Sequence, residues 1–366
     1  SWHRCRGPPR VPEVSPGLAS ADPGQGPGDE RPEPAPPWEV GGENWGDMRP
    51  TASASDTVGG AVPEAAQEQV APKSTSLPRA LLEVVRVPQW PKNVLVAAAP
   101  LAAGVLARPD VLLDTAVALV AFILASAGTY VLNDVGDVDG DRLHPRKRHR
   151  PIARGDIPLP LATVLGVVLL VSSVVLPGVL GYWPLTACIA TYAVLTSMYS
   201  RWLKHEPVVD LAVVAAGFLL RAMAGGLAAG LALSPWFLTV ASFGSLFVVA
   251  GKRYSELVGL GDEGPRMRPS LQAYSAGYLR FVWTLAAGVS VTAYCLWAFE
   301  VSRLGDTGSL APWLALSVAP FVVGVLRYSL TIDQGGAGAP EDILRSDRGL
   351  QVIGLVWLAV FTAGVV

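Results

Sequence analysis

Long apolar stretches alternate along this chain with short connections in which charged residues gather. A membrane-spanning helix needs about 20 apolar residues, because the hydrocarbon core is about 30 Å thick and each helical residue rises about 1.5 Å. Nine stretches approach that length, several of them short or interrupted by glycine, at roughly 93–108, 111–132, 160–181, 183–200, 207–230, 235–251, 281–299, 311–331 and 350–366. The pattern predicts an all-α, polytopic membrane protein with about nine transmembrane helices.

The composition supports a membrane environment and excludes an ordinary soluble domain. Apolar residues make up 51% of the chain, charged residues only 16%, and the mean hydropathy is +0.39. The net charge of −2 identifies no partner, and we expect no nucleic-acid binding. Cys5, Cys188 and Cys295 match no metal-binding spacing, so the two in apolar stretches are interpreted as packing residues. An assembly of several identical chains is left open.

Residues 1–77 differ in kind from the rest of the chain. Pro, Gly, Glu and Ser dominate them, and no apolar periodicity or signal peptide is visible. We expect a disordered tail there and one transmembrane domain over residues 78–366. Met48 begins a stretch whose composition suits a short cytosolic leader, so residues 1–47 are a candidate over-extended gene start.

The basic residues predict the orientation of the chain in the cell membrane. Of the 28 Lys and Arg residues, 19 lie in one set of alternating connections, whereas only Arg108 and Arg303 lie in the opposite set. Cytoplasmic loops carry the excess of Lys and Arg. We therefore expect the N-terminus and the connection that follows residue 132 to be cytoplasmic.

That connection concentrates acids next to a basic run. If the helix continues past Leu132, then Asn133, Asp137 and Asp141 lie at i, i+4 and i+8 on one face, with Asp134 beside them. Neighbouring carboxylates repel each other, and hard oxygen ligands suit Mg²⁺, which is often held by one or two carboxylates together with substrate phosphates. The spacing predicts a Mg²⁺-diphosphate site at the cytoplasmic face.

The basic run would meet the anionic remainder of such a substrate. It comprises Arg146, Lys147, Arg148, His149, Arg150 and Arg154. The simpler alternative is a solvated loop whose charges only set topology. Topology requires Lys and Arg but no helically spaced acids, so we favour the binding site.

The stretch NDVGDVDGD (133–141), followed by HPRKRHRPIARG (144–155), resembles the first Asp-rich motif of the UbiA superfamily of intramembrane prenyltransferases. The resemblance extends over residues 79–366. It implies a bundle of nine helices around a central cavity, a cap of cytosolic loops over the metal site and a lateral opening for a prenyl chain.

Within the superfamily, four further stretches resemble the branch that transfers phosphoribose from phosphoribosyl diphosphate to a polyprenyl phosphate, toward arabinan precursors of the actinobacterial cell wall. They are QWPKN (89–93), YSRWLKHEPVVD (199–210), GKRYSEL (251–257) and APED (339–342) with Asp347 and Arg348. Members that prenylate aromatic rings carry a second Asp-rich motif after the sixth span. Here that segment begins with Lys252, Arg253 and Tyr254, which suits a donor with an additional phosphate.

The resemblance implies roles for particular residues. Asp134, Asp137 and Asp141 would bind Mg²⁺, and Asp137, Asp141, Lys147 and Arg150 would take part in catalysis. Charge stabilisation on the departing pyrophosphate requires no side-chain nucleophile. Substrate-binding roles are implied for Gln89, Lys92, Asn133, Tyr199, Lys204, His205, Asp210, Lys252, Arg253, Tyr254 and Glu256.

Several residues keep a second interpretation. Lys204 could act only as one of the positive charges that orient the chain in the membrane, and His205 could simply be solvated. Asp210 and Arg221 lie inside apolar stretches, where a charge is costly unless it has a partner. Arg221 could pair with a lipid phosphate or with a backbone carbonyl, and the sequence does not decide between them.

Two other functions were weighed against phosphoribosyl transfer. Prenylation of an aromatic acceptor is disfavoured by the missing second Asp-rich motif. A transporter is disfavoured because the charges gather at one face and the two halves show no symmetry.

Overall fold

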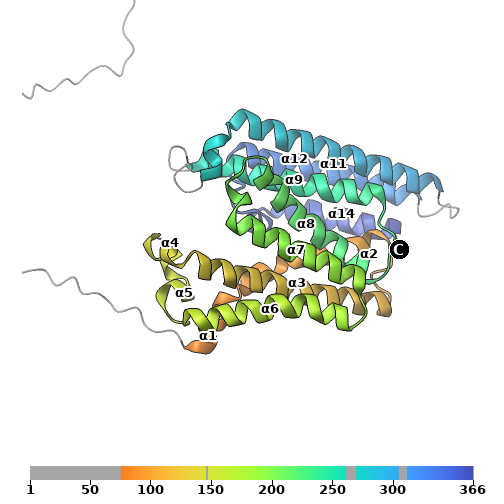
Figure 1. The fold of residues 1–366 in the computed structure, drawn as a ribbon. Coiled ribbons are helices and arrows are strands. Elements are labelled where there is room, and N and C mark those ends of the chain that lie inside the picture. The colour runs from red at the N-terminus through yellow and green to blue at the C-terminus, as the bar shows by residue number, and fades with distance from the viewer. Residues whose placement is uncertain (1–75, 146, 261–268, 305–310, 366) are drawn as a thin grey trace, which may run out of the picture. The chain divides into compact units, whose positions relative to one another are not determined.

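The computed structural model describes residues 76–145, 147–260, 269–304 and 311–365, all within one unit that begins at Gln69 (Figure 1). Every secondary-structure element in these ranges is a helix. Residues 1–75 of the predicted tail lie outside the described residues, as do Cys5 and Arg146.

Among the residues that the structure describes, seven helices are long and apolar enough to cross a membrane: α3 (Pro109–Gly136), α6 (Leu159–Val179), α8 (Val209–Ala228), α9 (Pro235–Leu260), α11 (Ala276–Leu304), α12 (Ala311–Asp333) and α14 (Arg348–Val365). They coincide with seven of the nine predicted spans. The predicted span at 183–200 is also a helix, α7 (Trp183–Arg201), but its threonine and serine residues make it less apolar. The all-helical prediction is confirmed within the described residues.

The predicted span at 93–108 is not one α-helix. A 3-10 helix, η1 (Val87–Ala97), is followed by the short α2 (Ala98–Ala102) and a turn at Gly104. Pro88, Pro91 and Pro100 lie in this stretch. Proline lacks a backbone N–H and collides with the carbonyl four residues earlier, so a regular α-helix is disfavoured here.

The long helices pack in two groups that meet at α8. On one side, α3 packs against α6, α7 and α8; on the other, α9 packs against α8 and α11, and α12 against α11 and α14. Glycine allows the closest approach in the first group. A Cβ on Gly128 of α3 would lie 2.8 Å from the backbone nitrogen of Leu170 on α6.

The outer surface of the bundle is apolar. On α6, large side chains are exposed over several turns, at Leu161, Val164, Val168, Val171 and Val175. A soluble protein rarely exposes so continuous an apolar face, whereas lipid accommodates it. The chain is therefore a multi-pass membrane protein.

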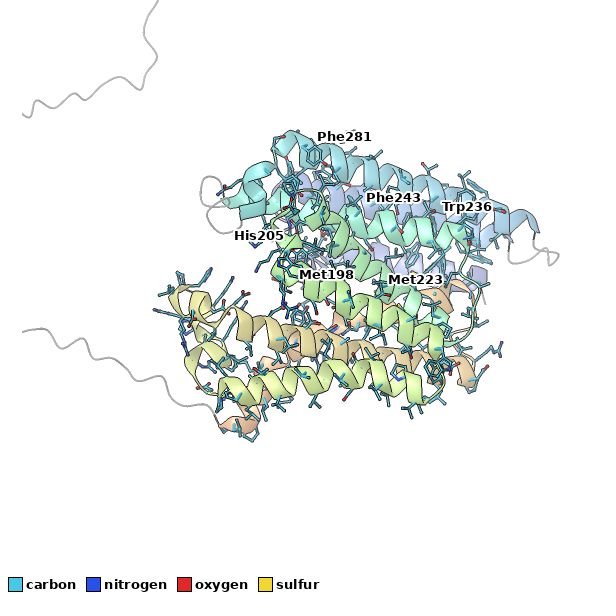
Figure 2. All side chains as sticks on the ribbon, viewed as in Figure 1. Met198, His205, Met223, Trp236, Phe243 and Phe281 are labelled. Atoms are coloured by element: carbon cyan, nitrogen blue, oxygen red, sulfur yellow. The ribbon has the colours of Figure 1, made fainter. Side chains whose placement is uncertain are left out.

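Figure 1 shows the short helices α1 (Leu77–Val84), α4 (Val138–Leu143) and α5 (Pro151–Arg154) at one end of the bundle. The other short elements that connect long helices are η2 (Lys147–His149), η3 (Leu203–His205), η5 (Pro269–Ala273) and α13 (Pro340–Ser346). Figure 2 shows His205 at the end that carries α4, and Trp236 at the opposite end. The charged connections therefore gather at one end of the helices.

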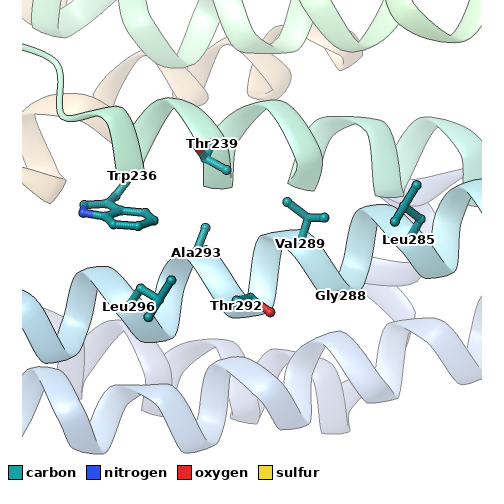
Figure 3. Close-up of a pocket in the computed structure, with 8 residues that line it drawn as sticks. All are labelled: Trp236, Thr239, Leu285, Gly288, Val289, Thr292, Ala293 and Leu296. Atoms are coloured by element: carbon teal, nitrogen blue, oxygen red, sulfur yellow. The ribbon is translucent and has the colours of Figure 1, made fainter. Parts of the chain in front are cut away.

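A groove of about 390 Å³ lies between α9 and α11 near that opposite end (Figure 3). Its lining includes Trp236, Leu285, Val289 and Leu296 and no ionisable side chain. A second groove, of about 300 Å³, is lined by apolar residues of α9, α12 and α14 such as Phe321. Neither groove contains the acids singled out above.

Candidate active site

The end of α3 determines where the acids point. The helix continues past Leu132, as predicted, but it is interrupted at Asp137 and resumes as α4. The side chains of Asp134 and Asp141 are buried, whereas that of Asp137 is 53% exposed. The backbone N–H groups of Asp137 and Asp141 still donate to the carbonyls of Asn133 and Asp137, at 2.9 and 2.8 Å, so the predicted helical register is kept, but the side chain of Asp137 is not buried with that of Asp141. Gly136 and Gly140 weaken the helix here, and repulsion between stacked carboxylates favours turning one outward.

Asp134 and Asp141 converge on one cationic atom. Nη1 of Arg150 donates a hydrogen bond to Oδ1 of Asp134 at 3.0 Å and to Oδ2 of Asp141 at 2.6 Å. Nζ of Lys147 lies 4.0 Å from Oδ1 of Asp141. The structure thus brings together Asp134, Asp141, Lys147 and Arg150, all of them predicted site residues. We call this group, together with Arg86, the first cluster.

Arg86 belongs to the first cluster, although no sequence motif distinguishes it. Its Nη2 donates to Oδ1 of Asp134 at 2.6 Å, and its guanidinium lies 4.7 Å from the ring centroid of Tyr130. Arg86 has a left-handed backbone (φ 54°), which is unusual for a residue other than glycine. In the sequence it was one basic residue among several that set topology, and only the fold carries it to Asp134.

Arg154 lies outside the first cluster. It donates to Glu83 at 3.1 Å and to Asp156 at 2.6 Å, and so ties α5 to α1. In this structure Arg154 links two helices, and its expected contact with a substrate phosphate stays a prediction.

A second cluster lies where α7, α8 and α9 meet. Arg253 donates through Nε and Nη2 to both oxygens of Asp210, at 3.1 and 3.2 Å, and through Nη1 to Glu256 at 3.0 Å. The hydroxyl of Tyr199 donates to Asp210 at 2.9 Å, and Nζ of Lys252 lies 3.8 Å from Glu256. A charged residue within an apolar span needs a partner, and Arg253 is that partner for Asp210. Arg253 is buried in this network, whereas Lys252 remains about one-third exposed.

Asp137 pairs with a residue of η3, the segment that precedes Asp210 in the chain. Nζ of Lys204, on η3 between α7 and α8, lies 3.8 Å from its carboxylate. Val208, two residues before Asp210, has φ 67°, a rare conformation for a β-branched residue. Its backbone N–H donates to the hydroxyl of Tyr274 at 2.6 Å. Strain of this kind gathers at functional sites.

The other predicted site residues lie on η1, α3, η3 and α9. The hydroxyl of Tyr254, on α9, accepts a hydrogen bond from Arg280 at 2.6 Å. His205 is exposed on η3, and Asn133 is half-buried on α3. Gln89 and Lys92 lie half-buried on η1.

A divalent cation fits the first cluster only with help from a substrate. Among the described residues, no group of three or more His, Cys, Asp or Glu side chains is arranged to hold a metal ion. Two buried carboxylates do converge, on the position now taken by Nη1 of Arg150. Mg²⁺ is commonly held by one or two carboxylates plus phosphate oxygens, so this donor set suits it.

These features define a polytopic α-helical membrane protein with two ionic clusters at one end of its spans. The UbiA prenyltransferase family matches residues 94–340, and the chain belongs to that family. It is 46% identical over 307 residues to the decaprenyl-phosphate phosphoribosyltransferase of Mycobacterium tuberculosis (strain H37Rv), covering 82% of this chain and 98% of that protein. It is 44% identical over 281 residues to the Corynebacterium glutamicum protein of the same name, covering 76% and 84%.

The fold is also that of solved relatives. A UbiA homolog from Archaeoglobus fulgidus, bound to GPP and Mg²⁺, superposes with a TM-score of 0.59 at 17% sequence identity. The match covers 78% of this chain and 99% of that one. At this identity the likeness establishes the fold alone.

Proposed function

We propose that this protein transfers 5-phosphoribose from phosphoribosyl diphosphate to a polyprenyl phosphate, decaprenyl phosphate in its relatives, and releases pyrophosphate for cell-wall arabinan precursor synthesis. The geometry that carries the proposal is the convergence of Asp134 and Asp141 on a single cation, with Lys252 held on α9 in a second ionic cluster. The identity of the donor and acceptor is supported by relatives that are 44–46% identical over most of the chain.

The first cluster is the proposed site for the diphosphate. Asp134 and Asp141 would hold Mg²⁺, and Asp137 would approach from the exposed flank with Asn133 beside it. When bound, the ion would neutralise charge on the departing pyrophosphate. A diphosphate also offers Arg86 and Arg150 new anionic partners, so both guanidinium groups can stay paired when the carboxylates take the metal.

The second cluster is the proposed site for the additional phosphate groups. Lys252 and Lys204 are each about one-third exposed and lie 3.8 Å from a carboxylate, which leaves them able to reach an anionic ligand. Arg253 is enclosed by Asp210 and Glu256, so its proposed role is to hold these acids in place. This refines the sequence-based expectation that Arg253 itself binds phosphate.

The chemistry needs alignment more than a reactive side chain. An oxygen of the lipid phosphate attacks C1 of the ribose, the bond from C1 to the pyrophosphate oxygen breaks, and the electron pair leaves with pyrophosphate. Lys147 and Arg150 stabilise the charge that develops on the leaving group. Lys204 and Lys252 orient the two anionic substrates, the donor and the lipid phosphate. No proton has to be removed from an ionised lipid phosphate.

We further propose that all nine predicted segments cross or enter the cell membrane, with η1–α2 and α7 completing the seven long spans around a central cavity. The distribution of basic residues supports a cytoplasmic position for both clusters and the loops that cap them. A cytoplasmic site suits a soluble, highly charged donor, whereas the lipid acceptor would arrive within the membrane.

A donor competition experiment tests the proposal. Purified protein in nanodiscs would receive labelled phosphoribosyl diphosphate and a labelled prenyl diphosphate together, with polyprenyl phosphate and an aromatic acid as acceptors. We expect the phosphoribosyl label to enter the lipid and the prenyl label to remain unused. Arg79→Gln is the matched control, since Arg79 is exposed on α1 at the same end and should tolerate loss of its charge. Consumption of the prenyl diphosphate alone would establish aromatic prenylation instead.

A further inference from the structure

Arg221 lies in the middle of α8, outside both ionic clusters, and is only 7% exposed. Its four defined hydrogen bonds go to neutral groups on four different segments. Nε donates to Oδ1 of Asn93 on η1 at 3.0 Å, and Nη1 to the carbonyl of Gly217 on α8 at 2.8 Å. Nη2 donates to Ser126 on α3 at 3.2 Å and to the hydroxyl of Tyr192 on α7 at 2.7 Å.

No carboxylate among the described residues forms an ion pair with Arg221. Instead its guanidinium lies 4.7, 5.6 and 5.8 Å from the ring centroids of Tyr192, Phe218 and Phe122. A buried charge compensated only by dipoles and rings is an expensive way to stabilise a fold, and an apolar side chain would be cheaper. The planar guanidinium is, however, able to join four segments at once, because it offers five N–H donors in fixed directions.

Among the hydrogen bonds of the described residues, only the one to Asn93 joins Arg221 to η1. The amide of Asn93 is oriented by this bond, because an arginine has no acceptor and must face the oxygen. Oδ1 also accepts a hydrogen bond from Ser126 at 3.2 Å. The buried Nδ2 has no partner among the described residues. An unsatisfied buried donor lowers the stability of the fold. The burial of Asn93 is therefore better explained by the contacts of its Oδ1, which join η1 to Arg221 and Ser126.

The segment that Asn93 holds has little stability of its own. Runs of 3-10 helix longer than three or four residues are uncommon because their hydrogen bonds are poorly aligned, and η1 has 11 residues and two prolines. It packs closely on α8, where a Cβ on Gly225 would lie 2.3 Å from the carbonyl oxygen of Val96. Arg86 lies at the N-terminal end of η1, where its backbone is in the left-handed region and its side chain donates a hydrogen bond to Asp134 of the first cluster. The segment is therefore held at both ends and stiffened by proline between them.

We propose that Arg221 is a positioning residue: through Asn93 it holds η1 in place, and thereby sets the position of Arg86 and Lys92 at the donor site. The part that concerns the donor rests on the proposed function, whereas the holding of η1 does not. Ser126 precedes Asp134 by eight residues on α3, so this junction lies about 12 Å deeper in the bundle than the first cluster.

The sharpest test is Asn93→Ala, which removes the link to η1 but leaves the other three acceptors of Arg221 intact. Arg221→Met is the second variant. The matched control is Ser317→Ala on α12, which deletes a buried hydrogen bond of 2.7 Å to Tyr294 in the other half of the bundle. A nitroxide on Val94→Cys, an exposed position of η1, would report the mobility of the segment after Cys5, Cys188 and Cys295 are replaced by alanine.

We expect both Asn93→Ala and Arg221→Met to raise nitroxide mobility at position 94 and to raise the Michaelis constant for the donor about tenfold, the size of one lost charge-assisted hydrogen bond. The Michaelis constant for the lipid should stay unchanged. Ser317→Ala should lower the unfolding temperature without either effect. If Arg221→Met fails to fold, Asn93→Ala carries the test alone.

Three results would overturn the proposal. The first is unchanged mobility at position 94 in Asn93→Ala. The second is raised mobility at position 94 with no change in the Michaelis constant for the donor. The third is an equal rise in the Michaelis constants for the donor and the lipid. If the unmodified protein does not use phosphoribosyl diphosphate at all, the proposed function fails, but the mobility measurement still decides whether Arg221 holds η1.

Discussion

Asp210 and Arg253 form a side-on ion pair, in which Nε and Nη2 of the arginine donate to the two carboxylate oxygens at 3.1 and 3.2 Å. Their side chains are 0% and 4% exposed. Each charge offsets the cost of burying the other, and together they join the start of α8 to the C-terminal half of α9. Arg253 therefore has a stability role that its place in a basic sequence motif does not reveal.

Breaking this pair should unfold the protein more easily. Arg253→Ala leaves Asp210 charged and buried without its main partner, which costs about 3–5 kcal/mol in comparable buried pairs. We expect a large drop in the unfolding temperature in detergent, measured by tryptophan fluorescence. The double variant Asp210→Asn with Arg253→Gln should recover much of that loss. A stability of Arg253→Ala equal to that of the unmodified protein would contradict the assignment.

Lys252→Ala should affect the donor and not the fold. Lys252 is partly exposed and lies 3.8 Å from Glu256, so its removal leaves no deeply buried charge without compensation. A charge-assisted contact is worth roughly 1.5–3 kcal/mol, so the Michaelis constant for phosphoribosyl diphosphate should rise about ten- to a hundredfold. Steady-state kinetics in nanodiscs would measure it, with Arg79→Gln as the control. An unchanged constant would remove Lys252 from the donor site.

Chelation should abolish turnover, and Mg²⁺ should restore it. The convergence of Asp134 and Asp141 suits a divalent cation that is completed by substrate phosphates. Mg²⁺ together with phosphoribosyl diphosphate should therefore raise the unfolding temperature more than either does alone. Full activity in excess EDTA would exclude the proposed metal site.

Asp137→Asn and Asp141→Asn should separate activity from stability. Asp137 is half-exposed, and its nearest cation, on Lys204, lies at 3.8 Å, so the amide should reduce turnover without lowering the unfolding temperature. Asp141 is buried and accepts a hydrogen bond of 2.6 Å from Arg150, so its replacement should lower both. Equal unfolding temperatures for the two variants would show that the burial difference has no energetic effect.

The Arg327–Asp347 pair should make stability depend on pH. Hydrogen bonds from Arg327, at 2.9 and 3.2 Å, lower the pKa of Asp347 below its ordinary value. A lowered pKa in the folded state means that the contribution is fully present above the ordinary carboxyl pKa of about 3.9 and is lost as the pH falls through the lower, folded value. Asp347→Asn keeps a side chain that can cap α14 but removes the charge. The difference in unfolding temperature between the two proteins should therefore be largest near neutral pH and shrink in acid.

The membrane character and most of the helices could be predicted from the sequence alone. Apolar runs of sufficient length form helices because lipid leaves backbone groups no other partners, so eight of the nine predicted spans coincide with single helices. The ninth, at 93–108, is divided between η1 and α2, because Pro91 just before it and Pro100 within it interrupt α-helical hydrogen bonding, although both prolines were visible in the sequence. The acidic motif and the basic residues near it were likewise recognisable from composition and spacing alone.

Which charges meet depends on how the chain folds. Helical spacing predicts Asn133, Asp137 and Asp141 on one face, but the buried pair that meets Arg150 is Asp134 with Asp141, which lie seven residues apart. The contacts Arg86–Asp134 and Arg221–Asn93 join residues 48 and 128 positions apart in the chain. No local pattern encodes such contacts, because they depend on how the helices cross and on which buried donor finds an acceptor within reach.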